Sequence, residues 1–365
     1  MDSELKLPFY AKATLIVIGL TVFVNVLYAV QGIIVPIIYS VILAIVLSPV
    51  VDFLQRKKIN NILAIVFSII LLCVVAILLA LVFYAQVNMF SDSFAKLLDK
   101  FSEVLNNLTL WASNYFNISV QNVNAYVANA KAEIISMSKN SVGLAISQLL
   151  RSLFVLGLIP VYVFMFLFYK PLLIEFIHKV FKEEDRAIVD EVLSSTKSIV
   201  QKYLIGLLIE AAIIATLNSL GLLIIGIDYA IILGITGAIL NVIPYIGGVI
   251  AIALPMIIAA VTKDSITYPI LVLGVYLFIQ FIDNHYVIPK IVASKVRINA
   301  LISIIVVLVG GALWGIPGMF LSIPLTAILK VIFDHIESLK PWGFLLGDTM
   351  PTISIRKLKF TSKKK

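Results

Sequence analysis

The stretch Gly237-Ala-Ile-Leu240-Asn-Val-Ile243-Pro244 decides the fold, because it interrupts an apolar run and recurs later in the chain. The second copy is Gly310-Gly-Ala-Leu313-Trp-Gly-Ile316-Pro317, so both copies share the pattern Gly-x-x-Leu-x-x-Ile-Pro. The copies lie within the apolar runs 230–262 and 299–332. Glycine and proline weaken the interior of a helix. The repeat therefore predicts two broken helices in equivalent settings.

Further glycine and proline follow each copy. Irregular backbone at membrane depth is tolerated only where protein or a water-filled cavity surrounds it, and paired breaks are typical of transporter sites. The alternative is that Pro244 and Pro317 merely kink ordinary helices. The expected hinge positions are Gly237, Pro244, Gly247, Gly248, Gly310, Pro317, Gly318 and Pro324.

The composition predicts an all-α polytopic membrane protein. Of the 365 residues, 61% are hydrophobic and 13% are charged, and the mean hydropathy is +1.08. A soluble domain is closer to half apolar and a quarter charged. A protein this apolar needs lipid as its solvent, and the expected partners are the lipid bilayer and a small-molecule or ion substrate.

The net charge of +8 does not point to nucleic acid, because much of it is concentrated at the C-terminus. Six of the last ten residues are basic, as expected of a cytoplasmic tail. The single cysteine, Cys73, excludes an intrachain disulfide. The sequence contains no zinc-protease motif, Walker A loop or nucleophile elbow, so we expect no catalytic residues, metal or cofactor.

Apolar runs of roughly 20 residues can cross the bilayer. We expect residues 1–87 to form N-terminal transmembrane helices and 88–150 an extracytoplasmic amphipathic helical insert. Residues 151–332 are expected to form a transmembrane core that contains a cytoplasmic segment, 171–204, and 333–365 a basic cytoplasmic tail. The expected spans are 13–30, 33–51, 62–86, 152–170, 205–227 and 266–282.

The basic loop at Arg56 to Lys58 predicts that the N-terminus is cytoplasmic, and the basic tail places the C-terminus there too. If each broken run crosses once, the chain has eight spans. If both are re-entrant hairpins, it has six, and the loop 283–298 is cytoplasmic. Lys290, Lys295 and Arg297 favour hairpins.

Glu210 is the one ionisable residue well inside an expected span, and Asn218 lies about two turns further along a similar face. An ionisable residue within a span is by default a functional hypothesis. Glu210 is therefore a candidate site for a proton or a cation. The alternative is that it hydrogen-bonds structurally near the membrane interface.

Three polar residues beside the expected breaks complete the candidate site. Asp283 and Asn284 follow the span 266–282 and could form one wall of a gate, or simply cap the helix. Asn241 precedes the first break, where Gly247 and Gly248 would expose backbone groups able to bind an ion. Trp314 takes the place of Asn241 in the second copy, so the first break is the better candidate for binding.

In three stretches, the sequence resembles the autoinducer-2 exporter family. They are Asn241-Val-Ile-Pro-Tyr-Ile-Gly-Gly248, Gln280-Phe-Ile-Asp-Asn284 through Pro289, and Gly310-Gly-Ala-Leu-Trp-Gly-Ile-Pro-Gly318 with Pro324. The resemblance implies a bacterial inner-membrane permease that is homo-oligomeric, for example a pentamer. Relatives are described as exporters of autoinducer-2 or as sodium/proton antiporters.

Two classes of function follow. The first is a secondary transporter that exports a small solute or exchanges a cation with H⁺ or Na⁺. The second is a passive channel, or a membrane scaffold whose extracytoplasmic insert binds a partner.

Overall fold

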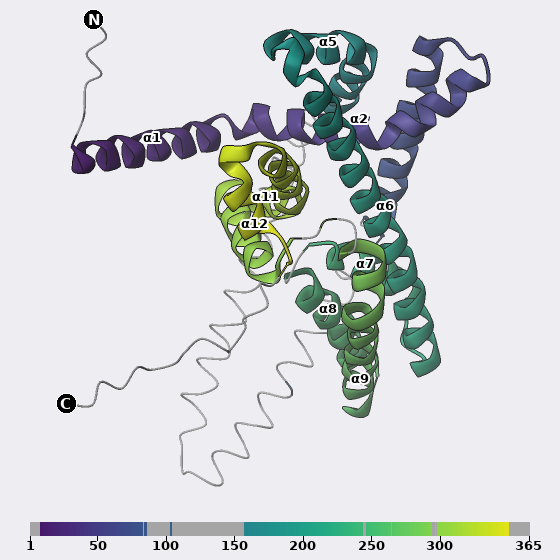
Figure 1. The fold of residues 1–365 in the computed structure, drawn as a ribbon. Helices are drawn as coiled ribbons and strands as arrows, with labels where there is room; N and C mark the ends of the chain where they lie inside the picture. Colours follow the sequence, from purple (N-terminus) through teal and green to yellow (C-terminus); the bar gives the residue numbers. More distant parts are fainter. Residues whose placement is uncertain are drawn as a thin grey trace, which may run out of the picture.

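A computed structural model describes residues 8–82, 84, 85, 103, 157–243, 246–263, 265–293, 296 and 298–349. These residues form helices joined by short connections, which confirms the all-α membrane fold (Figure 1). The expected insert 88–150 lies, apart from residue 103, outside the described residues. So do Pro244, Lys295 and Arg297.

The N-terminal part consists of α1 (Phe9–Ala29), α2 (Gln31–Arg56) and the helix Asn61–Val82. No residue of α1 is buried, and the helix extends away from the rest of the molecule (Figure 1). In the most apolar 18-residue stretch of α2, a third of the residues are buried. Ala44 and Leu47 of α2 pack against the Asn61–Val82 helix. Helix α2 therefore belongs to the core, whereas α1 offers its apolar surface to its surroundings.

The helix Gly157–Phe168 bends by 64° into α5 (Lys170–Val180). A short 3₁₀ turn, Glu183–Asp185, then leads into α6 (Arg186–Ile225). The charged residues from Lys182 to Arg186 are all exposed, as expected of a solvated face.

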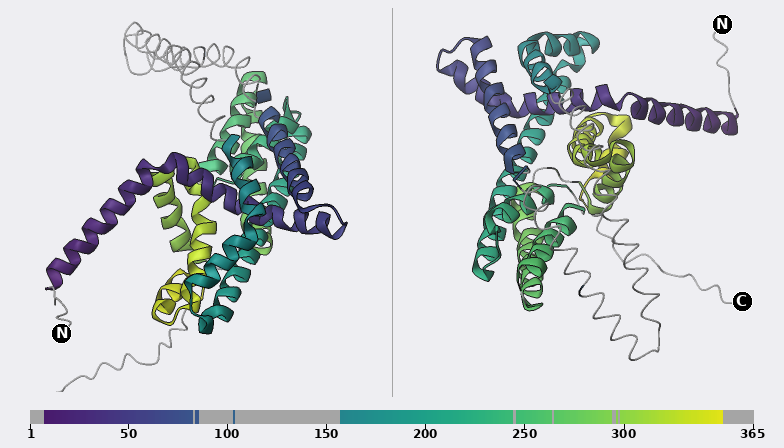
Figure 2. Two further views of the ribbon diagram at one scale, coloured as in Figure 1. Left: turned by 90° about the horizontal axis from the view of Figure 1, so that it is seen from above. Right: turned by 180° about the vertical axis from the view of Figure 1, so that it is seen from behind.

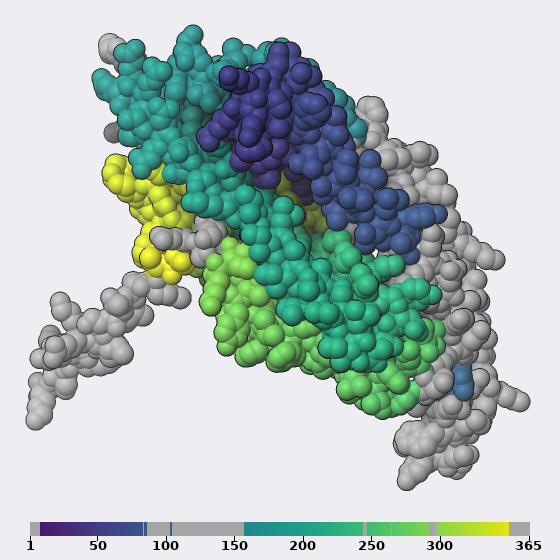
Figure 3. Space-filling model, turned by 90° about the vertical axis from the view of Figure 1, so that its right-hand side faces the viewer, coloured from purple at the N-terminus to yellow at the C-terminus, as the bar shows by residue number. Residues whose placement is uncertain are grey.

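Helix α6 is 40 residues long and runs without a break from the expected cytoplasmic segment into the expected span. Figure 3 shows it between the N-terminal helices and the later helices, α7 to α9. Its Val200 and Leu204 are buried against Ile42 of α2 and Leu321 of α11, so the part of α6 before the expected span also packs into the core.

The first broken run forms α7 (Ala230–Asn241) and α8 (Ile246–Thr262). A Cβ atom built on Gly237 would lie 3.6 Å from Cβ of Ala251, so the two helices lie side by side as a hairpin. Helix α9 (Thr267–Ile282) follows and continues directly into a π-helical stretch, Asp283–Ala293. The expectation of a loop starting at residue 283 is therefore wrong.

The second broken run lies in α11 (Ala300–His335), which reverses at Gly315. Gly310 approaches both Gly318 and Ser322, so the two halves also form a helical hairpin (Figure 2, left). A 3₁₀ turn, Glu337–Leu339, and α12 (Lys340–Leu346) pack the chain back on this hairpin. The expected tail 333–365 is therefore helical at its start, and its basic end lies outside the described residues.

Within the described residues, six helices are long and apolar enough to cross a membrane, and the bent pair ending in α5 makes a possible seventh. One of the six is α11, which the reversal at Gly315 divides into two shorter halves. The chain is thus a multi-pass membrane protein with two broken hairpins.

Candidate functional site

A cavity of about 560 Å³ lies where α6, the α7–α8 hairpin and α9 with its π-helical continuation meet. It holds three of the five polar residues that the sequence singled out. Its lining residues are Glu210, Asn241, Gly248, Val249, Ile252, Gln280, Asn284 and Ile288.

Glu210 enters the cavity from the middle of α6 and is only 6% exposed. It shares the buried face of this helix with Tyr203, Ile214 and Asn218. This spacing of three to four residues keeps one side of a helix against its neighbours. Glu210 is thus enclosed by protein.

Asp283 lies beside the cavity and is fully buried. Its Oδ2 accepts a 2.9 Å hydrogen bond from Nδ2 of Asn241, which ends α7. Its Oδ1 has no hydrogen-bond partner among the described residues. Glu210 lines the same cavity as Asn241, the hydrogen-bond partner of Asp283, and Asn284, its neighbour in sequence. Two buried acidic side chains from different helices therefore lie near one another.

Asp283 begins a π-helical stretch, Asp283–Ala293, and lies beside the cavity within a continuous helix. Pro289 lies inside this stretch and has no backbone N–H to donate to the preceding turn. Wider helical turns of this kind are rare and often occur at functional sites. The sequence signal for this feature is the proline six residues after Asp283.

The break between α7 and α8 approaches the cavity through two glycines. A Cβ atom on Gly247 would collide with the carbonyl oxygen of Leu240, so the chain can turn here only because this residue has no side chain. A Cβ atom on Gly248 would lie 3.4 Å from Oδ1 of Asn241 and 3.8 Å from Oε1 of Gln280. Two amide oxygens thus converge on the backbone at Gly248.

Asn218 does not line the cavity. It is buried two turns further along α6, and its Nδ2 would lie 3.4 Å from a Cβ atom on Gly237. The hydroxyl of Tyr276 would lie 3.1 Å from the same Cβ atom. Both Oδ1 of Asn218 and this hydroxyl have no hydrogen-bond partner among the described residues. Asn218 and Tyr276 therefore form a second buried polar pair at Gly237, outside the lining of the cavity.

The second break lies apart from the cavity, and its contacts are structural. Nε1 of Trp314 donates to the carbonyl oxygen of Leu27 in α1 at 3.2 Å. The hydroxyl of Tyr39 in α2 donates to the carbonyl oxygen of Pro317 at 3.2 Å, and its ring stacks on Phe320. The tip of this hairpin is thus held against the junction of α1 and α2.

The comparison with protein families identifies the chain. The family model of the AI-2E family transporters matches residues 17–338, nearly the whole length. The chain belongs to the AI-2E transporter family. This agrees with the resemblance carried by the glycine-proline breaks.

Three curated relatives of this AI-2E family chain are bacterial. "Putative transport protein YrrI" of Bacillus subtilis is 32% identical over 36% of this chain and 37% of its own length. A "Putative transport protein" of Haemophilus influenzae is 26% identical over 87% of this chain and 90% of its own. "Putative permease PerM" of Escherichia coli K12 is 23% identical, over 84% and 88%. The match to YrrI covers little more than a third of that protein.

Two features of this AI-2E family chain lie outside the expected set of site residues. Gln280 contributes an amide oxygen to the cavity, and its place one turn before Asn284 on the same helix face was the available signal. The second break occurs at Gly315, two residues before Pro317, with φ 64° and ψ −145°. Pro317 begins the second half of the hairpin, whereas Pro324 is buried further along it.

Proposed function

We propose that this AI-2E family transporter is a secondary transporter that exports a small solute, or exchanges a cation, in return for H⁺ or Na⁺. One observation carries the proposal: buried Glu210 lines a cavity at the break between α7 and α8, together with Asn241, whose amide is bonded to the buried Asp283. Residues of this type inside spans often mark ion pathways and proton relays.

The charge around the cavity supports a cationic ligand. None of the described residues that line it is basic, and one of them, Glu210, is acidic. An uncompensated carboxylate in a low-dielectric interior is costly. A proton or a metal cation would balance that charge, and the carboxyl and amide oxygens match the hard oxygen ligands that small cations prefer.

The two hairpins suggest how access would alternate. The α7–α8 hairpin packs against α6 and α9 through a buried apolar cluster that includes Leu233 and Ile258. It approaches the backbone of α6 closely at one glycine, Gly234, which lies against Ser219. The second hairpin is instead held at its tip by Trp314 and Tyr39. We infer that the first hairpin moves relative to a scaffold that includes the second.

The experiment is ion flux in proteoliposomes under an imposed Na⁺ or pH gradient, followed with a pH-sensitive dye inside the vesicles. We expect gradient-driven flux in the natural protein and its loss in Glu210→Gln. The matched control is Glu184→Gln, which removes an exposed carboxylate outside the cavity.

Flux that is only downhill and unchanged in Glu210→Gln would contradict coupled transport and favour the passive channel. No flux at all in the natural protein, with either ion, would favour the scaffold. These two outcomes are distinct, because the first leaves a conducting protein and the second does not.

We further propose that the chain lies in the bacterial inner membrane with both termini in the cytoplasm, as a homo-oligomer. The basic loop Arg56 to Lys58 supports the orientation.

The unburied helix α1 supports assembly, because a second copy could cover part of its apolar surface. Cross-linking of single cysteines along α1 in native membranes tests this: ladders of linked subunits are expected, and monomers alone would contradict it.

A further inference from the structure

Two further cavities lie between α2, the bent helix pair (Gly157–Phe168 with α5) and α6, away from the Glu210 cavity. Their volumes are about 440 and 460 Å³. Four residues line both of them, so the two form one continuous cleft. The shared residues are Ser48, Leu167, Lys170 and Ile174.

One part of this cleft is almost entirely apolar. Helix α2 contributes one wall, the bent pair contributes the opposite wall, and Leu193 of α6 lies at the back. This part is a slot suited to a hydrocarbon chain. Its other apolar lining residues are Val41, Ala44, Ile45, Phe166, Leu167, Leu173, Ile174 and Ile177.

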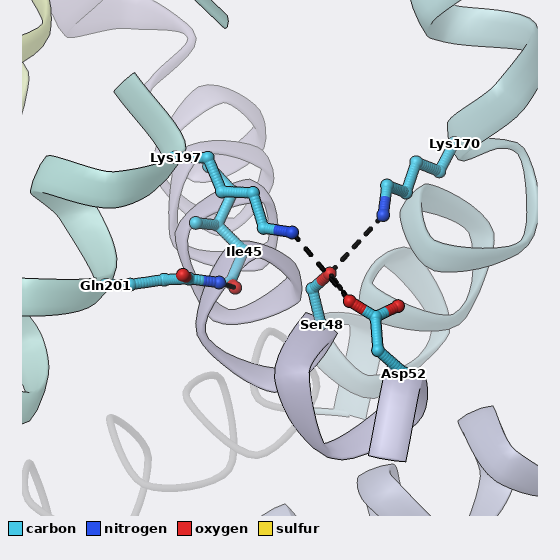
Figure 4. A network of polar contacts seen from close by, with 6 residues as sticks. All are labelled: Ile45, Ser48, Asp52, Lys170, Lys197 and Gln201. Carbon is cyan, nitrogen blue, oxygen red and sulfur yellow. Dashed lines mark hydrogen bonds and ion pairs between the residues drawn. The ribbon is translucent and has the colours of Figure 1, made fainter. Parts of the chain in front are cut away.

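Two lysines meet at the polar centre of the cleft (Figure 4). Nζ of Lys170 donates to Oγ of the buried Ser48 at 3.4 Å, and Nζ of Lys197 lies 3.8 Å from Oδ2 of Asp52. Ser48 Oγ in turn donates to the same Asp52 oxygen at 3.5 Å. The ammonium groups point at this spot from opposite sides, and Asp52 pairs with Lys197 directly but reaches Lys170 only through Ser48.

Three basic side chains, Lys170, Lys197 and Arg186, and three acidic ones, Asp52, Glu175 and Asp190, line the cleft. Glu175 lies 4.0 Å from Lys179, which does not line the cleft, and Asp190 lies 2.7 Å from His178. With Lys179 included and His178 counted as neutral, the surroundings of the cleft carry one net positive charge. Within the described residues, Lys170 has no carboxylate partner and is half-buried, so an anion would find a donor already directed into the cleft.

Helix α5 carries an exposed apolar stripe. Leu172, Phe176 and Val180 recur every four residues and are 61%, 63% and 61% exposed. An apolar stripe on a helix bent 64° from its neighbour is typical of a helix that lies in the headgroup layer. The lysines at its start and on α6 then lie at the depth of lipid phosphates.

We propose that this cleft binds an anionic phospholipid of the surrounding bilayer. The phosphate lies beside the ammonium groups of Lys170 and Lys197, and an acyl chain fills the apolar slot between α2 and α5. The bilayer is the source because the slot needs a hydrocarbon chain and the lysines need an anion, and one molecule at this depth carries both. The site is separate from the Glu210 cavity and independent of the transport proposal.

The test is native mass spectrometry of the purified, delipidated full chain titrated with phosphatidylglycerol. We expect Lys170→Gln/Lys197→Gln to weaken the tightest binding step by roughly 30-fold, as two basic residues at a lipid surface would. The matched control is Lys179→Gln, which removes an exposed charge from α5 outside the cleft. Equal weakening in this control would indicate general surface attraction and overturn the site.

A second variant tests the slot without changing charge. Leu173→Trp narrows it at a partly exposed position and should also weaken phosphatidylglycerol binding. Phosphatidylcholine with the same chains should bind the natural protein weakly. Displacement of the lipid by an equal concentration of inorganic phosphate would show a simple phosphate site. That result, or unchanged lipid binding in both variants, would overturn the proposal. Circular dichroism of each variant shows that it is folded.

Discussion

Nδ2 of Asn241 donates a 2.9 Å hydrogen bond to Oδ2 of Asp283, and this bond joins the end of α7 to the first residue of the π-helical stretch. The two residues are far apart in sequence, and each lies where a helix departs from regular geometry. The bond therefore ties the break in the first hairpin to the irregular end of α9, directly beside Glu210.

Asn241→Ala should destabilise the protein, because it leaves the buried Asp283 carboxyl without its one described hydrogen-bond donor. Removing one partner of a buried polar pair costs about 1–3 kcal/mol. The measurement is the melting temperature in detergent. Asn25→Ala is the control, since the Asn25 amide donates to Thr21 on the exposed α1. Equal melting temperatures for the two variants would contradict a stabilising role for Asn241.

Glu210→Gln and Asp283→Asn should affect transport non-additively, because the two buried carboxyl groups lie near one another. Each single change removes one possible carrier of a proton or cation and should reduce gradient-driven flux. The double variant should depart from the sum of the single effects by about 0.5–3 kcal/mol in transition free energy. Flux rates of the four proteins in matched proteoliposomes give this quantity. Strict additivity would mean that the two residues act separately.

Sequence reasoning could anticipate the two hairpins and most of the candidate site, because lipid imposes severe rules on backbone breaks and charges. The repeated glycine-proline pattern located the hairpins, and the rarity of charge inside spans located Glu210. Asn241, Asp283 and Asn284 were predicted from their positions beside breaks. The structure brings these three together with Glu210, although their roles stay a prediction.

Sequence reasoning failed where tertiary packing sets local geometry. The helix after Ile282 continues in π-helical form, although polar residues and Pro289 are typical of a helix end. The second reversal occurs at Gly315, because only glycine readily adopts the backbone angles found there. Pro317 lies just after the reversal, in the first turn of the second half of α11, where a helix accepts proline. The separation of Asn218 from the cavity depends on helix packing, which periodicity along one helix cannot show.

Lys290→Cys in a Cys73→Ser background tests the membrane topology. If both broken runs are re-entrant hairpins, residue 290 faces the cytoplasm, and a membrane-impermeant maleimide should label it only in inside-out vesicles. Lys290 is exposed, so the reagent can reach it. A cysteine at Lys57, in the basic loop after α2, should label from the same side. Labelling of residue 290 from outside would mean that the runs cross the membrane singly.

Gly247→Ala should disrupt the first hairpin, since the new methyl group would collide with the carbonyl oxygen of Leu240. Overpacking of this kind costs about 1–3 kcal/mol. Gly274→Ala is the control, because a Cβ atom there meets nothing within 4 Å and α9 is regular at this point. The melting temperature in detergent and gradient-driven flux should both fall for Gly247→Ala and stay near the natural values for Gly274→Ala. Equal behaviour would contradict a close approach at Gly247.

Gly315→Ala separates backbone strain from packing at the second reversal. A Cβ atom on Gly315 meets nothing within 4 Å, so any cost comes from its φ of 64° and ψ of −145°. This region is essentially restricted to glycine, and other residues held there cost about 1–3 kcal/mol. We expect a lower melting temperature for Gly315→Ala and no loss for Gly19→Ala, which adds the same methyl group to open space on the regular helix α1.

The same variant also distinguishes the two hairpins. Because the tip at Gly315 is held by Trp314 and Tyr39 and lies apart from the Glu210 cavity, strain there should lower stability more than transport. Gradient-driven flux per folded protein should therefore stay close to that of the natural protein, in contrast to Gly247→Ala. A selective loss of flux in Gly315→Ala, with an unchanged melting temperature, would instead assign the moving part to the second hairpin.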